Sequence, residues 1–319
     1  MSAPARLRPG AGRDGARTGF LRRPLDLCAL ALTGAAAWRH AAAHTQQTLV
    51  QPLPLTCRIA VVPTGRACGA TTVALQLTGA LTRSRRAPAL VLSASPGTGA
   101  AADRLPFSRR WPLEEPVPTA VPPAELGPAL RGSAGCGPDG LTSCLRLVAA
   151  EPGLPPTWHR ARRELGHFFD TCLTEFGPLT HAELAEIAPL HHALVLVTPA
   201  RRREVERARA RLRRLAEALT GHPADAAVGA VGAVGAEPAA APPAGTRRGR
   251  PPVVLHAVVA TAPGHPLIPR LGPDEILVPY DPALRRPGPT PLRRRTAVAI
   301  AALAARAVDA AAQSARGEA

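Results

Sequence analysis

The sequence predicts an α/β fold in which a mostly parallel, doubly wound sheet is flanked by helices in a three-layer arrangement. Two observations predict it. The chain has 319 residues, of which 46% are hydrophobic, and this is enough to bury the core of one large domain. Short β-type runs also alternate with segments of helical period, which is the pattern of strand–helix–strand units. Such units join parallel strands through helices that cover both faces of the sheet.

The elements are predicted in chain order from this alternation. The first strand–helix–strand unit comprises residues 58–62, 71–83 and 89–92. The strands predicted after it are 145–150, 168–174, 192–198, 252–261 and 275–278, and the helices are 158–165, 180–188, 199–220 and 296–312.

Two domain-level divisions are expected. Residues 1–56 are predicted to form an N-terminal extension, partly helical and partly disordered, and 57–315 to form the α/β domain. Flexible insertions are predicted near 106–138, which is rich in Pro and Gly, and near 222–250, which contains the near repeat AVGAVGAVGAEPAAAPPAG. The apolar run 25–38 resembles a signal peptide, but it is interrupted by Asp26 and is too short to span a bilayer, so no transmembrane segment is expected.

The composition excludes several kinds of chemistry. The chain contains no Lys and no Asn, a bias typical of a GC-rich bacterial genome, and the missing Lys excludes Schiff-base catalysis. The six cysteines lie at positions 28, 57, 68, 136, 144 and 172 without zinc-ligand spacing. They are expected to be core residues in a reducing cytoplasm, with a link between Cys136 and Cys144 as the alternative. His191 and His192, even with His181, lack the spacing of a metal site.

The net charge of +16 suits a polyanionic partner, although a compositional drift toward Arg explains it equally well. The densest group of arginines lies in Arg201–Arg214, on one predicted helix. This group is interpreted either as a solvated helix face or as a contact for nucleic acid or an anionic membrane surface. Aromatic residues make up only 3%, which excludes a base-stacking platform.

A candidate binding loop follows the first predicted strand. It comprises Gly65, Arg66, Ala67, Cys68, Gly69, Ala70, Thr71 and Thr72. A strand, a turn of small residues and a helix that opens with hydroxyl side chains form the layout of a phosphate-binding loop. In such a loop the backbone N–H groups and the helix dipole attract phosphate.

This segment resembles the deviant Walker A motif, KGGxGKTT, of MinD/ParA-class P-loop ATPases. The resemblance implies that Gly69 is the last glycine, that Thr71 is the Mg²⁺-coordinating hydroxyl and that Thr72 is the hydroxyl after it. Gly65 and Ala70 stand where the family has its two lysines. The resemblance therefore implies a degenerate nucleotide site for ATP or ADP with Mg²⁺, or a protein that requires no cofactor.

Three other segments carry the same resemblance. LSASPGTGAAADRL at 92–105 is similar to the family's VDANPDRGTLADRV, with Ser93 in place of the functional aspartate. FDTCLTEFG at 169–177 is similar to the Walker B type FDVVLTDWG, which implies that Glu175 is the metal-facing acid. The VPYDP segment implies that Pro279, Tyr280 and Asp281 lie near the adenine.

The missing lysines leave three functional hypotheses. Without the two cations phosphoryl transfer loses about 10³ or more in rate, by analogy with arginine fingers, unless Arg66 substitutes for one of them. The first hypothesis is a non-hydrolysing scaffold or regulatory partner in secretion or partitioning. The second is a weak ATP-binding switch that uses Thr71, Glu175 and Arg66, and the third is an arginine-rich binder of DNA or membrane surfaces.

The resemblance is closest to actinobacterial MinD-like proteins found with type VII (ESX-like) secretion components. It implies a protein partner, namely a second copy, an intact MinD/ParA-like relative or secretion components. It also implies a cytoplasmic location, with attachment at the membrane only through partners.

Overall fold

The computed structural model describes residues 36–53, 55–96, 99–105, 139–147, 153–220, 251–285 and 291–317. The insertions predicted at 106–138 and 222–250 lie outside these residues, as do Cys28 and Cys136. The chain divides into two compact units, Met1–His44 and Thr45–Ala319. Of the first unit the structure describes 36–44, all of them in a helix that ends at residue 50.

The sequence placed the domain boundary later, after residue 56. Residues 45–56 belong to the second unit because they bond to it directly. Leu49 is buried in its core, and Arg85 donates hydrogen bonds to the backbone carbonyls of Leu49 and Gln51, both at 2.8 Å.

The second unit is built on a seven-stranded sheet in which every described pairing is parallel. The strands are β1 (Cys57–Pro63), β2 (Ala89–Ala94), β3 (Thr142–Arg146), β4 (Thr171–Phe176), β5 (Ala193–Pro199), β6 (Val253–Val259) and β7 (Glu275–Val278). Their order in the sheet is β3-β2-β4-β1-β5-β6-β7. The predicted parallel, doubly wound sheet is confirmed.

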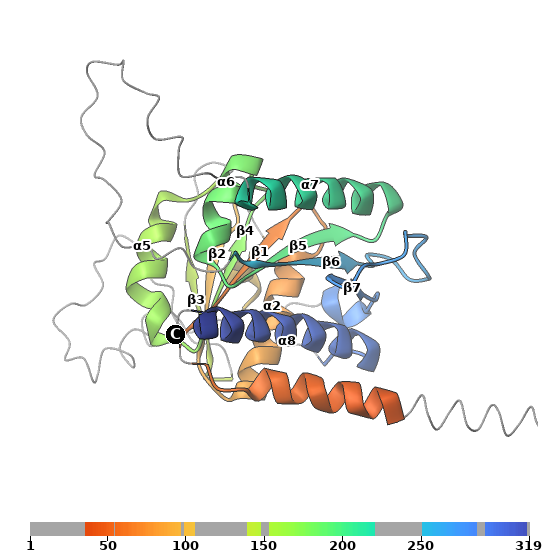
Figure 1. The fold of residues 1–319 in the computed structure, drawn as a ribbon, viewed down its shortest axis with the longest axis horizontal. Helices are drawn as coiled ribbons and strands as arrows, with labels where there is room; N and C mark the ends of the chain where they lie inside the picture. The colour runs from red at the N-terminus through yellow and green to blue at the C-terminus, as the bar shows by residue number, and fades with distance from the viewer. Residues whose placement is uncertain are drawn as a thin grey trace, which may run out of the picture. The chain divides into compact units, whose positions relative to one another are not determined.

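Helices cover both faces of this sheet, which completes the three layers (Figure 1). One face carries α2 (Ala70–Arg85), the short α3 (Ala101–Arg104) and α8 (Arg294–Gly317). The other carries α5 (Pro156–Leu165), α6 (His181–Ile187) and α7 (Arg202–Thr220). The 3₁₀ turns η1 (Gly166–Phe168), η2 (Ala188–Leu190) and η4 (Pro282–Arg285) complete the described elements.

The core follows from the two-residue period of the strands. In β1, Ile59 and Val61 pack beneath α2 and α8, whereas Ala60 and Val62 pack on the opposite face. Because both faces are covered, the central strands read as continuous apolar runs, as parallel strands do.

Two strands are displaced from their predicted bounds. β3 is Thr142–Arg146 instead of 145–150, and β4 is Thr171–Phe176 instead of 168–174. Both begin with polar residues that are buried all the same, namely Thr142, Ser143 and Thr171. Apolar pattern alone misses such residues, because their backbone pairs with β2 whatever the side chain.

Helix bounds differ by a few residues. Pro199 ends β5 instead of opening the next helix, which begins at Arg202. α8 runs longer than the predicted 296–312. It is, within the described part of the chain, the one helix long and apolar enough to cross a membrane, but 61% of its most apolar stretch is buried against the domain.

The described cysteines Cys57, Cys68, Cys144 and Cys172 are buried free thiols, as predicted for core residues. Cys144 therefore carries no disulfide in this structure.

Candidate functional site

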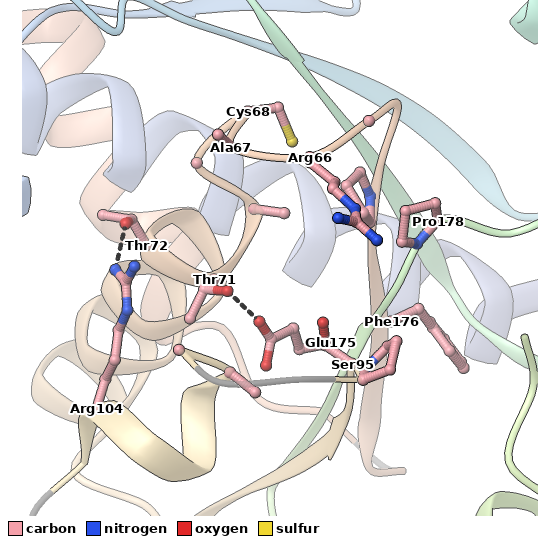
Figure 2. A pocket seen from close by; sticks show the side chains of 17 residues that line it. Arg66, Ala67, Cys68, Thr71, Thr72, Ser95, Arg104, Glu175, Phe176 and Pro178 are labelled. Carbon is pink, nitrogen blue, oxygen red and sulfur yellow. Dashed lines mark hydrogen bonds between the residues drawn. The ribbon is translucent and has the colours of Figure 1, made fainter. Parts of the chain in front are cut away.

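A pocket of about 600 Å³ lies at the carboxyl ends of the central strands (Figure 2). This is the edge at which open α/β sheets bind ligands. It lies between the β1–α2 loop (residues 64–69) and the segments that follow β2 and β4. The residues that line it are Pro63, Gly65, Arg66, Ala67, Cys68, Gly69, Ala70, Thr71, Thr72, Ser95, Pro96, Gly99, Ala100, Arg104, Glu175, Phe176 and Pro178.

The β1–α2 loop is held by β5 and β6, the two strands that follow β1 on one side of the sheet. The Thr64 N–H donates to the carbonyl of Val197 in β5 at 2.9 Å. Gly69, with φ +92°, is the residue before α2, and a Cβ added there would lie 3.3 Å from Cγ1 of Val259. Glycine is therefore required at this position for its backbone angle and favoured by the close contact. Ala67 also has a positive φ, 55°, which is costly for a residue with a Cβ.

Thr71 and Glu175, which the resemblance implies are the metal-facing hydroxyl and acid, are in contact at the floor of the pocket. The Thr71 hydroxyl, in the first turn of α2, donates a hydrogen bond to Oε1 of Glu175 near the end of β4 (Figure 2). The other carboxylate oxygen, Oε2, accepts from the Ala101 N–H at 2.7 Å and from the Ser93 hydroxyl at 3.2 Å.

Glu175 is only 1% exposed. This burial raises the pKa of its carboxyl group, and the hydrogen bonds from Thr71, Ala101 and Ser93 oppose the rise. A buried acid that accepts from three donors is held in one orientation.

The Cys68 side chain of the loop is buried, and burial raises the pKa of its thiol. Backbone N–H groups of the loop, including those of Ala70 and Gly65, act on this pKa in the opposite direction.

The pocket has no cation at the lysine position of the motif. Ala70 stands there, and it belongs both to the lining of the pocket and to the core between α2 and the sheet. Two arginines line the pocket instead. Arg66 is exposed and extends from the loop above Glu175 in the view of Figure 2. Arg104, from α3, donates a hydrogen bond to the Thr72 hydroxyl at 2.9 Å.

Sequence reasoning missed two contributors to this site. Arg104 stands where the family run VDANPDRGTLADRV also has Arg, and this match is the signal in the sequence for its position. The Ala101 contact is made by a backbone N–H group. No side-chain pattern can indicate such a contact.

The structure does not bring the VPYDP segment to the pocket. Pro279, Tyr280 and Asp281 are not among the lining residues, and β7 is separated from β1 by β5 and β6. The buried Asp281 carboxylate accepts hydrogen bonds from the N–H groups of Ala283 at 3.0 Å and Arg293 at 2.6 Å. It thereby fixes the turn before α8.

The arginines of 201–214 are divided between contacts within the domain and solvent. Arg202 and Arg207 pair with Glu206 and Glu204 on α7 itself. Arg209 pairs with Glu275 of β7, and Arg211 donates to the carbonyl of Leu179. The exposed arginines for which the described residues supply no ion pair are Arg201, Arg203, Arg213 and Arg214. Arg202 and Arg207 are also exposed, so within the group only Arg209 and Arg211 are withdrawn from the surface that a polyanion could reach.

The buried His191 and His192 precede β5, and His181 opens α6. Among the described residues, no group of three or more His, Cys, Asp or Glu side chains could hold a metal ion.

With this geometry in hand, comparison with known proteins adds no assignment: no protein-family model matches the chain, and no curated protein matches it. Function has to be argued from the fold and the pocket.

The residues at the pocket floor could supply two of the oxygen ligands of a magnesium ion. Mg²⁺ prefers oxygen ligands, and the Thr71 hydroxyl and the Glu175 carboxylate are the oxygens that would hold it. When bound, the ion would neutralise phosphate charge.

Proposed function

We propose that this chain is a degenerate MinD/ParA-like P-loop protein that acts as a non-hydrolysing scaffold or regulatory partner. The observation that carries the proposal is the hydrogen bond between Thr71 and Glu175 at the pocket floor. The resemblance to Walker A and Walker B motifs implied that these two residues share one site, and they come from different elements of the fold. Their contact supports the alignment with the Walker motifs, and it is this alignment that places Gly65 and Ala70 at the positions of the two lysines.

The same alignment argues against efficient hydrolysis. Phosphoryl transfer depends on positioning and on neutralising the charge that develops on the transferred group. At the lysine position Ala70 supplies no cation. Arg104 is occupied by Thr72, and Arg66 projects from the outer part of the loop. A cation that contacts the transferred phosphoryl group contributes about 10³-fold or more to the rate, so its absence should leave hydrolysis slow.

The role that remains is one of binding other proteins. A second copy of this chain or an intact MinD/ParA-like relative is the partner we propose, in secretion of the type VII kind or in partitioning. The four buried free thiols favour a reducing compartment, and we propose the cytoplasm.

Thermal unfolding with Mg-ATP and Mg-ADP, run beside an assay of released phosphate, tests this proposal. We expect no saturable rise in melting temperature up to millimolar nucleotide and no phosphate release above background, in the wild type and in Thr71→Ala alike. Saturable, Thr71-dependent phosphate release would contradict the proposal.

A second candidate function is favoured by one observation. Because Thr71 and Glu175 suit Mg²⁺, the pocket is also compatible with a weak nucleotide switch in which Arg66 contacts the phosphates. In that case Mg-ATP would raise the melting temperature, and Thr71→Ala and Arg66→Ala would each abolish the rise without affecting phosphate release.

A further inference from the structure

A second group of polar side chains lies at the opposite edge of the sheet, where the strands begin. Arg58 is the second residue of β1, and His191 and His192 directly precede β5. Arg162 lies in the last turn of α5, which leads through η1 into β4. Because the strands are parallel, these starting points share one edge, away from the pocket already described.

The hydrogen bonds of His192 leave two donors facing each other. Its Nδ1 accepts the backbone N–H of Arg58 at 3.1 Å. A neutral imidazole has one acceptor nitrogen, so the proton of this ring is on Nε2. That Nε2 lies 3.1 Å from Nη2 of Arg58, which is also a donor. Burial and the Arg58 charge lower the pKa of His192 to about 4, so the ring is neutral at pH 7.

The two arginines hold further donors without acceptors. Nε of Arg58 and Nε of Arg162 are both buried and make no hydrogen bond. A buried donor without a partner destabilises the fold, because it has lost its hydrogen bonds to water without replacement. In the described part of the chain, neither guanidinium is joined to a carboxylate: Asp170 is taken by Arg85, and Glu164 by Arg160.

His191, in contrast, has a buried acceptor nitrogen without a donor. It is 4% exposed and stacks on Trp158, with 5.6 Å between ring centroids. Its Nδ1 lies 2.8 Å from the carbonyl of Ile187, so Nδ1 carries the proton and Nε2 has a lone pair. That Nε2 is buried and has no partner. The guanidiniums of Arg162 and Arg58 are near enough for their charges to add to the lowering of the His191 pKa that burial causes.

The four side chains thus offer several strong donors and one acceptor, with no counter-charge. We propose that this edge binds a hydrogen phosphate ion between Arg58 and Arg162. The unprotonated oxygens accept from the guanidiniums, which recognise such oxygens in pairs, and the P–OH group donates to Nε2 of His191. Arg162, which lies over the Trp158 ring at 5.6 Å, is held in place by that contact.

The pattern distinguishes phosphate from similar anions. At pH 7.5 inorganic phosphate still carries a proton. Sulfate carries none, and a phosphate monoester, with a second pKa of about 6, has mostly lost its own. Of these three anions, only inorganic phosphate can accept from the arginine N–H groups and also donate to Nε2 of His191. The site is independent of the nucleotide pocket, and its existence does not rest on the proposed function.

Thermal unfolding of the full chain at pH 7.5 and constant ionic strength tests the inference, with phosphate, sulfate, phenyl phosphate or chloride as the anion. At a phosphate concentration ten times Kd we expect a rise of about 3 °C over chloride. The rise is absent in Arg58→Met and Arg162→Met and retained in Arg163→Met, which removes the exposed arginine beside Arg162. An equal rise with sulfate or phenyl phosphate, or a rise that survives in both site variants, would overturn the proposal.

A second measurement covers the case in which a variant does not fold. In the wild type, phosphate is expected to shift the ¹⁵N and ¹H resonances of two arginine Nε–H groups and to slow their exchange with water. Unchanged arginine resonances at saturating phosphate would refute the site.

Discussion

At the scale of single residues, the β1–α2 loop combines a left-handed glycine with a buried acid contact. Gly69 has a left-handed backbone against Val259, and Thr71 donates to Glu175. Under the proposed alignment with the Walker A motif, Ala70 stands in place of a lysine and Ala67 in place of a glycine. The proposal therefore predicts a loop that keeps its geometry and lacks its cations.

Gly69 is the residue on which this conformation depends most. Gly69→Ala places a Cβ in the left-handed region and 3.3 Å from Val259, so we expect it to lower the free energy of unfolding by about 1–2 kcal/mol. Urea unfolding measures this. Gly65→Ala is the matched control, because nothing lies within 4 Å of a Cβ there, and it should change stability by less than about 0.5 kcal/mol. If the two changes lowered the free energy of unfolding equally, the backbone angle at Gly69 would not be the cause of the loss.

Some site residues could be predicted from the sequence and others could not. Thr71 and Glu175 could be predicted because a motif fixes their position in the chain, and the fold brings them into contact. Asp281 could not, because its partners are backbone N–H groups of the turn before α8. A resemblance locates a residue in the chain. It does not show which groups pack around it.

At the scale of elements, the outer edge of the sheet is joined to α7 by one polar cluster. Glu275 in β7 accepts from Nε of Arg209 at 2.8 Å and lies 2.9 Å from Nδ1 of His256, whose Nε2 lies 3.0 Å from the Thr198 hydroxyl. The hydrogen bond from Arg209 is the main cause that lowers the pKa of Glu275 to about 2. The cluster thus holds β7, β6, β5 and α7 together.

We expect Glu275→Gln to lower the free energy of unfolding at pH 7 by about 2 kcal/mol, a value reduced for the partial exposure of Arg209. Because the pKa of Glu275 is lowered on folding, its contribution is complete above the ordinary value of 4.5 and is lost as the pH falls toward 2. The difference between wild type and variant should therefore shrink below pH 4.5 in chemical denaturation. Glu217→Gln, an exposed change on α7, serves as the control; a pH-independent difference would exclude the ionic role of Glu275.

At the scale of the whole molecule, the alternation of strands and helices was enough to predict the α/β class. Strands buried on both faces, such as β1 and β5, are unmistakable apolar runs. The bounds of β3 and β4 were not predicted, because Thr142, Ser143 and Thr171 are buried through backbone pairing and not through apolar side chains. The division at residue 44 differs from the predicted boundary at 56, because Leu49 and Gln51 contact Arg85 in the second unit.

Buried neutral histidines make the whole domain sensitive to acid. Burial lowers the pKa of His191 to about 3 and that of His192 to about 4. The unfolded chain takes up protons at both rings below their ordinary value of 6.5, and the folded chain does not, so stability falls as the pH drops from 6.5 to about 4.

His191→Phe, which keeps a ring against Trp158, should reduce the slope of unfolding free energy against pH by up to about 1.4 kcal/mol per pH unit in that range. Urea unfolding at several pH values in chloride measures the slope. The exposed His159→Gln is the control and should leave it unchanged. A slope unaffected by His191→Phe would mean that this ring titrates alike in both states.

We propose that the β1–α2 loop is a phosphate-binding loop in which Ala70 stands in place of the cation. Calorimetric titration of Mg-ATP into Ala70→Lys, beside the wild type and the control Ala67→Lys, tests it most directly. Restoring a cation at the start of α2 should give saturable binding in Ala70→Lys alone, at least about tenfold tighter than any wild-type binding. If Ala70→Lys binds no better than Ala67→Lys, the alignment of this loop with the Walker A motif is wrong.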